Sequence, residues 1–288
     1  MANLKETRNR IVSIKSTMQI TSAMKMVSAA KLKRAQDAIT RMRPYAEKLQ
    51  EILGNVSSSV EGNTIAQYTD VRTVKNVLVV TFTSNRGLCG GFNSSVSKAA
   101  LNHIQKNLQG KNVDVLAIGK KAGEWLKIKG VPVAKIELDI FNDINFAASS
   151  VISEAVVADF LNQKYDQVVL IYNKFVNAAV QEVQVEQLLP IVPTATEGSS
   201  NVDYIYEPEK EQIILDLIPK SLKTQFYKAL LDTVAGEHGA RMTAMHQATD
   251  NAGALAKDLT LQYNKARQAA ITTEILEIVG GAEALDNA

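Results

Sequence analysis

The stretch MANLKETRNRIVSIKSTMQITSAMKMVSAAKLKRAQDAITRMR, residues 1–43, contains neither glycine nor proline. Apolar residues recur along it every three or four positions, as in Ile11, Ile14 and Met18, which is the spacing of one helix face. A helix over residues 4–56 would be about 80 Å long, whereas a globule of this chain length is only about 50 Å across. We therefore expect the helix to project and to bury its apolar face on another helix or on a partner.

The end of this helix is also marked in the sequence. Pro44 lacks an amide proton and disfavours the helical conformation at Arg43, so we expect it to kink or locally open the helix. Gly54 and the serines at 57–59 predict where the helix ends. Small residues such as Ala23 and Ala30 lie on its apolar face and would allow a second helix to approach closely.

The middle of the chain alternates between two patterns. Short runs rich in Val, Ile, Leu and Phe predict buried strands over residues 77–82, 113–118, 131–136 and 168–172. Helical patterns lie between them, over residues 94–108, 121–129 and 146–161. This alternation predicts a central Rossmann-like βαβ domain with a mainly parallel sheet. Val183 and Val185 alternate with polar residues and indicate a half-exposed edge strand.

The C-terminal part begins with a loop-like stretch at residues 188–208, which contains three prolines, a glycine and two serines. We expect a short helix over residues 209–218, ending before Pro219, and then a long alanine-rich helix from 220 to about 279. Glycines at 236, 239 and 253 are its only expected interruptions. The two terminal helices are predicted to pair as a long antiparallel coiled coil. The predicted domains are an N-terminal coiled-coil helix (1–58), the α/β domain (75–190) and a C-terminal coiled-coil helix (208–286).

Charge is distributed unevenly along the chain. Residues 1–50 contain eleven Lys or Arg against three Asp or Glu, a net charge of +8, whereas residues 201–288 contain eight against thirteen, a net charge of −5. The two ends are thus complementary, as expected of paired helices. A basic arm could also bind nucleic acid, but no aromatic residue precedes Tyr45 to stack on bases, so we expect no nucleic-acid partner.

The composition argues against several classes of protein. No run of about 18 uncharged apolar residues could span a membrane, and the first residues lack the apolar core of a signal peptide. Cys89 is the only cysteine, which excludes an internal disulfide, and the three scattered histidines argue against a metal site. We expect a cytosolic chain, or one peripheral to a membrane, without a bound metal.

One loop resembles a ligand-binding element in its position. Residues 86–91, RGLCGG, follow the first predicted strand, where phosphate-binding loops usually lie. Their glycine spacing is not GxGxxG, and the lysine and hydroxyl of a P-loop are missing. We favour a tight turn with Cys89 as a buried small residue rather than a reactive thiol. No other residue pattern indicates catalysis, so the sequence predicts no active site and no cofactor.

These observations leave three functions open. The chain could be an assembly protein with a helical rod, or an α/β enzyme with helical arms, which would need a small ligand at residues 84–93. It could also be a coiled-coil adaptor or a nucleic-acid-binding arm.

Several ordered motifs resemble one family. ITSAMKMVSAAKL (20–32) is similar to the opening helix of the γ subunit of bacterial F-type ATP synthases, and SNRGLCGGFN (84–93) resembles that family's loop after the first strand. LLP (188–190), residues 237–251 and YNKARQA (263–269) resemble later segments. ITTEILEIVGGA (271–282) resembles the C-terminal signature, so the resemblance extends from one end of the chain to the other.

The resemblance implies a non-catalytic central-stalk rotor, present once per complex. The coiled coil would turn inside the hexamer of α and β subunits, and the α/β domain would hold the ε subunit and the ring of membrane c subunits. Rotation would couple ion flow to ATP synthesis or hydrolysis and regulate ATPase activity and proton flow. The expected location is the cytoplasmic side of the bacterial cell membrane, as a peripheral subunit.

The resemblance also assigns contacts to the β subunit by motif. Met24 and Lys25 would lie near the acidic helix-turn-helix that acts as the lever of β. Arg86 and Cys89 would lie close to the same region. Polar contacts that hold the rotor in its stopping positions would come from Arg241, Arg267, Gln268 and Thr272. Glu274 and Glu277 match the C-terminal signature, and from spacing alone they are expected to face solvent or a basic partner.

Overall fold

The computed structural model describes residues 4–57, 67–69, 72–191 and 210–286. Its helices are α1 (Leu4–Ser57), α3 (Phe92–Asn107), α4 (Lys120–Ile128), the short 3-10 helix η1 (Asp139–Phe141), α5 (Phe146–Leu161) and α6 (Lys210–Asp286). Its strands are β1 (Asn76–Phe82), β2 (Asn112–Ile118), β3 (Val133–Glu137), β4 (Gln167–Phe175) and β5 (Gln181–Leu189).

The chain divides into two compact units. One combines Met1–Val27 with Met242–Ala288, and the other is Ser28–Arg241. Both long helices contribute to both units. The domain boundaries expected from the sequence, 1–58, 75–190 and 208–286, keep each long helix whole, whereas these two units divide both helices. The expected boundaries therefore stay a prediction. Most of the loop-like stretch expected at residues 188–208 lies outside the described residues.

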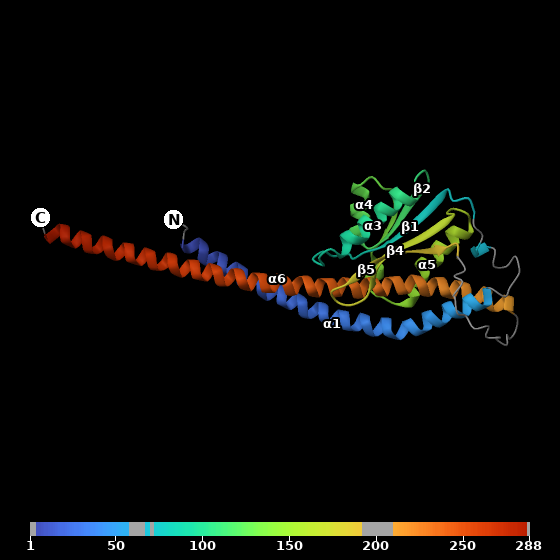
Figure 1. Ribbon diagram of the computed structural model, residues 1–288, viewed down its shortest axis with the longest axis horizontal. Coiled ribbons are helices and arrows are strands. Elements are labelled where there is room, and N and C mark those ends of the chain that lie inside the picture. Colours follow the sequence, from blue (N-terminus) through green and yellow to red (C-terminus); the bar gives the residue numbers. More distant parts are fainter. Residues whose placement is uncertain (1–3, 58–66, 70–71, 192–209, 287–288) are drawn as a thin grey trace. The chain divides into compact units, whose positions relative to one another are not determined.

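The unit Ser28–Arg241, the α/β unit, is built on one five-stranded sheet with the order β3-β2-β1-β4-β5 (Figure 1). The strands from β1 to β4 pair in parallel, and β5 runs antiparallel to β4 along one edge. This confirms the mainly parallel sheet with an edge strand predicted from the sequence. The third strand begins at Val133 rather than at residue 131, because the Val131 amide bonds to the Leu126 carbonyl at the end of α4.

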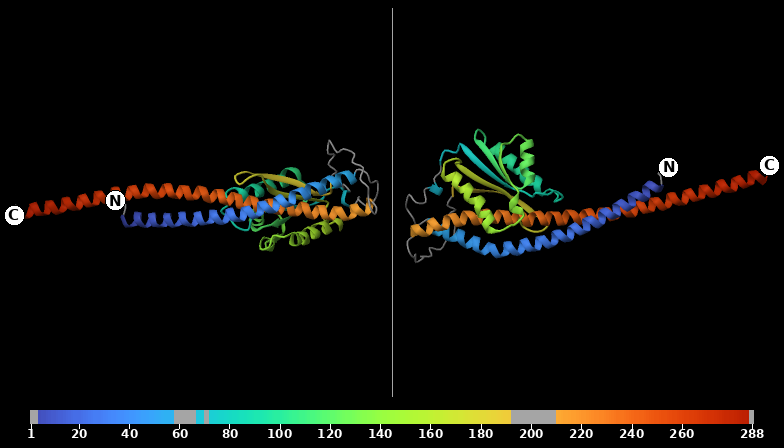
Figure 2. Two further views of the ribbon diagram at one scale, coloured as in Figure 1. Left: turned by 90° about the horizontal axis from the view of Figure 1, so that it is seen from below. Right: turned by 180° about the vertical axis from the view of Figure 1, so that it is seen from behind.

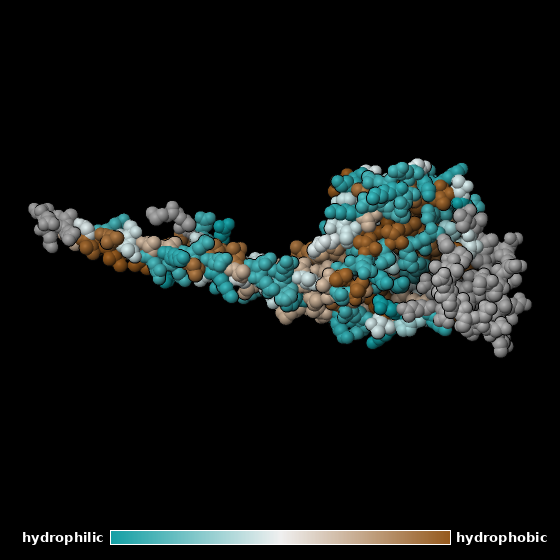
Figure 3. Space-filling model, viewed as in Figure 1, coloured by the Kyte–Doolittle hydropathy of each residue, from teal (hydrophilic) through white to brown (hydrophobic). Residues whose placement is uncertain are grey.

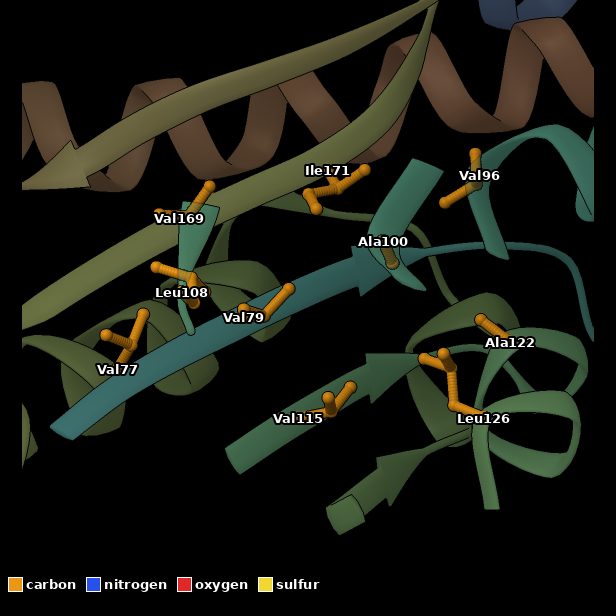
Figure 4. Packing of buried hydrophobic residues seen from close by; sticks show 10 residues of the cluster. All are labelled: Val77, Val79, Val96, Ala100, Leu108, Val115, Ala122, Leu126, Val169 and Ile171. Carbon is orange, nitrogen blue, oxygen red and sulfur yellow. The ribbon is translucent and has the colours of Figure 1, made fainter. Parts of the chain in front are cut away.

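One face of the sheet is covered by α3 and α4. Val79 of β1 and Val115 of β2 pack there against Val96 of α3 and Leu126 of α4, in a cluster that Figure 4 shows from close by. These four side chains are fully buried, and burial stabilises each by roughly 1.5–3 kcal/mol. The uninterrupted apolar runs in the sequence therefore come from strands that are covered on both faces.

The other face of the sheet is covered by α5 and by the first part of α6 (Figures 1 and 2). Phe82 of β1 meets Phe226 of α6 edge to face, with ring centroids 5.0 Å apart, and Tyr172 of β4 lies 6.3 Å from Phe82. Phe146 of α5 and Tyr227 of α6 make a similar contact at 5.6 Å. Large aromatic side chains thus fix α6 against the sheet.

The unit formed by the two chain ends is a pair of helices. Thr249 of α6 donates a hydrogen bond to Thr21 of α1 at 2.8 Å. Four residues further along α6, a Cβ atom built on Gly253 would lie 3.7 Å from the Met18 sulfur. Residue numbers rise on one helix as they fall on the other, so the pairing is antiparallel, as predicted.

The sequence-based expectation for α6 was wrong in one respect. A single helix runs from Lys210 to Asp286 through Pro219, where we expected one helix to end and another to begin. Ile218 and Leu222 on either side of this proline are both buried. Their burial favours a continuous helix and offsets the loss of about 3 kcal/mol that an interior proline causes.

Pro44 and the glycines of α6 do not end the helices either. Helix α1 continues through Pro44 to Ser57, close to the end predicted at Gly54 and the following serines. In α6, a Cβ at Gly236 would lie 2.8 Å from the Phe92 ring, and one at Gly239 would lie 3.1 Å from the Ala178 backbone. These glycines therefore serve close packing on the α/β unit rather than interruption of the helix.

Candidate functional site

The loop between β1 and α3 is held by its own side chains. Asn93 accepts a hydrogen bond from the Ser84 amide at 3.0 Å and donates one to the Cys89 sulfur at 3.2 Å. The Cys89 side chain is 1% exposed, and burial raises the pKa of its thiol. This confirms Cys89 as a buried residue of a tight turn.

The tip of this loop has an unusual backbone. Leu88 has a φ of 62°, in the left-handed region that non-glycine residues rarely adopt, and Gly90 has a φ of 57°. The Leu88 side chain is nevertheless 66% exposed, and Arg86 is exposed beside it. The loop therefore presents one apolar and one cationic side chain to solvent.

The N-terminus of α4, which follows β2, is capped by the segment that follows β1. The first amides of α4 donate to this segment: Lys120 to the Asn85 side chain at 3.1 Å, Lys121 to the Ser84 carbonyl at 3.3 Å and Ala122 to Thr83 Oγ1 at 3.0 Å. These amides are therefore not available to bind a phosphate group.

A buried ion pair lies on α6. Arg241 Nη1 is 2.7 Å from Glu237 Oε1, and both side chains are only 9% exposed. Burial raises the pKa of Glu237, with the charges of Arg241, Lys31 and Arg86 acting in the opposite direction. The neighbouring His238 has its pKa lowered to about 4 by burial, and further by the charges of Arg241 and Lys31.

The same arginine also contacts the loop after β1. Arg241 Nη2 lies 3.2 Å from the Gly87 carbonyl oxygen and 3.5 Å from that of Arg86. The structure thus brings together three of the residues that the resemblance assigned to partner contacts: Arg86, Cys89 and Arg241. Of the three, only Arg86 is exposed.

The other predicted site residues lie in the helical pair. Met24 and Lys25 are half-buried on α1. The remaining residues are all exposed on α6, namely Arg267, Gln268, Thr272, Glu274 and Glu277. The exposure of Glu274 and Glu277 agrees with the expectation that they face solvent or a partner.

Sequence reasoning missed the buried ion pair made by Glu237, the neighbouring His238 and the exposed Leu88. The spacing of four between Glu237 and Arg241 is a recognised signal for an ion pair on one helix face. Nothing in the sequence marks Leu88 as exposed. Among the described residues, no group of three or more His, Cys, Asp or Glu is placed to hold a metal ion.

Comparison with known proteins decides the family. The family model described as ATP synthase matches residues 3–285. The ATP synthase gamma chain of Flavobacterium johnsoniae is 60% identical over 287 residues, covering 99% of this chain and 100% of the relative. The chain belongs to the ATP synthase gamma chain family. The gamma chain of Cytophaga hutchinsonii, 51% identical and fully covered, supports the same assignment.

Chains of solved mitochondrial ATP synthases share this fold. A chain of the Euglena gracilis mitochondrial ATP synthase, from a structure of OSCP, F1 and c-ring, has a TM-score of 0.69 at 21% identity. The match covers 98% of this chain and 94% of that one. A chain from the central stalk and c-ring of the Tetrahymena thermophila enzyme has a TM-score of 0.58 at 26% identity, covering 80% and 99%. Within the described ranges, no helix is long and apolar enough to cross a membrane.

Proposed function

We propose that this chain is the central-stalk rotor of a bacterial F-type ATP synthase. It couples ion flow through the membrane c-ring to ATP synthesis or hydrolysis in the hexamer of α and β subunits, and regulates both ATPase activity and proton flow. It has no active site of its own, binds the ε subunit, and is present once per complex. Its place is peripheral, on the cytoplasmic side of the bacterial membrane.

The observation that carries this proposal is the exposed end of α6. Every residue from 267 to 282 is exposed, including the apolar Ile271, Ile275, Leu276, Ile278 and Val279. Figure 3 shows apolar surface along this part of the helix. A helix with such a surface is stabilised by a partner that covers it. The hexamer of α and β subunits would be that partner.

Polar residues at this end would make the contacts with β that hold the rotor in its stopping positions. Arg267, Gln268 and Thr272 are exposed on α6, and Glu274 and Glu277 follow within two turns. Exposed charges give weak contacts that re-form quickly, which suits an interface that moves. On the other helix, Met24 and Lys25 would lie near the acidic lever of β, as would Arg86 of the α/β unit.

Reconstitution tests the rotor function directly. Purified α and β subunits should gain fully active ATP hydrolysis only when this chain is added, and the chain alone should neither hydrolyse ATP nor bind it tightly in a calorimetric titration. If α and β are fully active without the chain, the rotor proposal is wrong.

The double substitution Arg267→Ala with Gln268→Ala tests the contacts. We expect coupled turnover of the reconstituted complex to fall by about tenfold, because two polar interface contacts are lost. The melting temperature of the isolated chain should not change, since both side chains are exposed. Lys257→Ala with Gln262→Ala, which removes two exposed side chains elsewhere on α6, is the control. Equal loss of turnover and stability would argue against a contact role.

A further inference from the structure

The loop after β1 holds an exposed apolar residue in a disfavoured conformation. Leu88, with φ of 62°, is 66% exposed and so gains little from burial. A residue persists in such a conformation only where its surroundings impose it, and conformations of this kind gather at functional sites. What holds Leu88 in place therefore bears on what the loop does.

Two anchors flank this residue. On the side after it, Cys89 is buried and accepts a hydrogen bond from Asn93. On the side before it, the carbonyl oxygens of Arg86 and Gly87 are both within hydrogen-bond reach of Arg241 Nη2. The second anchor crosses from α6 to the loop, over 154 residues of sequence. A guanidinium can make this contact because it presents several donors in a fixed plane.

The charge of Arg241 is already balanced within the chain. Glu237 faces it at 2.7 Å, and both side chains are nearly removed from solvent. The cations that stay exposed around this pair are Arg86 and Lys31. A buried, paired guanidinium is poorly placed to meet a partner, whereas the two exposed groups of the loop are well placed to do so.

We infer that Arg241 is a positioning residue. It fixes the loop after β1 so that Arg86 and Leu88 are presented together to an acidic partner surface that also offers an apolar contact, and it does not itself touch that partner. The presentation to the β subunit rests on the proposed function. The contacts by which Arg241 holds the loop, here called the clamp, do not rest on the proposed function, because they all lie within this chain.

Cys89, the only cysteine, provides a probe of the clamp in the full chain. Its thiol is buried while the loop is closed, so its reaction with Ellman's reagent reports loop opening. We expect Arg241→Ala to speed labelling by about tenfold or more, because hydrogen bonds from a charged donor are lost. Arg241→Ala is also compared with its parent in a Glu237→Gln background, because there the substitution leaves no buried carboxylate without its ion-pair partner.

Two further variants separate the clamp from general stability. Arg241→Lys keeps the charge opposite Glu237 but loses the planar fork, so labelling should rise by about threefold or more even if the alanine variant does not fold. Leu126→Ala removes a buried side chain from the α3 and α4 face without touching the loop, and should leave native-state labelling slow. Wild-type labelling rates in both Arg241 variants would overturn the inference.

Turnover of the reconstituted complex tests the positioning role. If Arg241 acts through the loop, Arg241→Ala lowers turnover in the wild-type background but causes no further loss when Arg86→Ala and Leu88→Ala are already present. A direct contact between Arg241 and the partner would instead lower turnover by the same factor in both backgrounds, which would refute the positioning role. If no loop variant changes turnover while Arg241→Ala still speeds labelling, the clamp stands and the proposed use of the loop fails.

Discussion

Gly119→Ala is expected to destabilise the α/β unit by more than about 4 kcal/mol, which is at the upper end for a single substitution. Gly119 joins β2 to α4 with a φ of 101°, where a side chain is strained. A Cβ built there would lie 2.0 Å from the Thr83 carbonyl oxygen and 2.7 Å from its carbon. Backbone atoms, unlike the end of a flexible side chain, cannot rotate away from such a clash.

The strands on both sides prevent relief by movement. The Thr83 amide donates to the Ile118 carbonyl at 2.8 Å, and the Gly119 amide donates to the Glu137 carbonyl at 2.8 Å. A shift that relieves the clash must therefore break the sheet where β1, β2 and β3 end. The measurement is urea unfolding followed by circular dichroism, with the midpoint compared to that of wild type.

Gly110→Ala is a matched control. Gly110 also has a positive φ, of 74°, but nothing lies within 4 Å of a Cβ at this position. Its substitution incurs only the conformational strain, about 1–2 kcal/mol. If both glycine variants lost the same stability, close approach to Thr83 would not be the reason that residue 119 is glycine.

The second large effect concerns pH. Asp232 of α6 is 2% exposed, and no side chain or backbone group in the described part of the chain makes a hydrogen bond with its Oδ1. Burial raises the pKa of this carboxyl from 3.8 to about 6, although the Phe175 backbone amide and the charges of Lys228, Arg43 and Lys174 oppose the shift. The native state therefore binds a proton more tightly at Asp232 than the unfolded state does.

The sign of the effect follows from this difference. Between pH 4 and 6 the native state holds more protons at Asp232, so its contribution to stability is full below pH 4 and is lost as the pH rises through 6. A shift of about two units corresponds to about 3 kcal/mol. His238 acts in the opposite direction, because a pKa lowered to about 4 makes its contribution grow as the pH rises from 4 to 6.5.

Asp232→Asn isolates the carboxyl from these opposing contributions. The variant keeps the shape of the side chain and cannot ionise, so its stability relative to wild type should increase by about 3 kcal/mol between pH 4 and pH 7. Urea unfolding at a series of pH values measures this difference. Asp216→Asn, at an exposed position of the same helix, controls for the change in net charge. A constant difference between Asp232→Asn and wild type across the range would contradict a buried, titrating Asp232.

Local sequence patterns predicted most of the fold. The apolar runs located the strands to within three residues at each end, because a strand covered on both faces must be apolar throughout. Pro219 misled the prediction, because a local rule for ending helices cannot include the burial of Ile218 and Leu222 on its two sides. Glycines 236 and 239 indicated interruptions for the same reason, since the residues that they approach, Phe92 and Ala178, lie far away in sequence.

The candidate site divides in the same way. By itself, the sequence determined the two terminal helices, the parallel sheet, the tight turn around Cys89 and, through its ordered motifs, the family, because each of these depends on residues close together in the chain. Only the tertiary structure decided that Arg241 meets the carbonyls of Arg86 and Gly87, and that Arg241 is buried opposite Glu237 while Arg86 and Leu88 are exposed. Such contacts depend on how α6 packs on the sheet, and packing between segments more than 150 residues apart leaves no periodic pattern in one sequence.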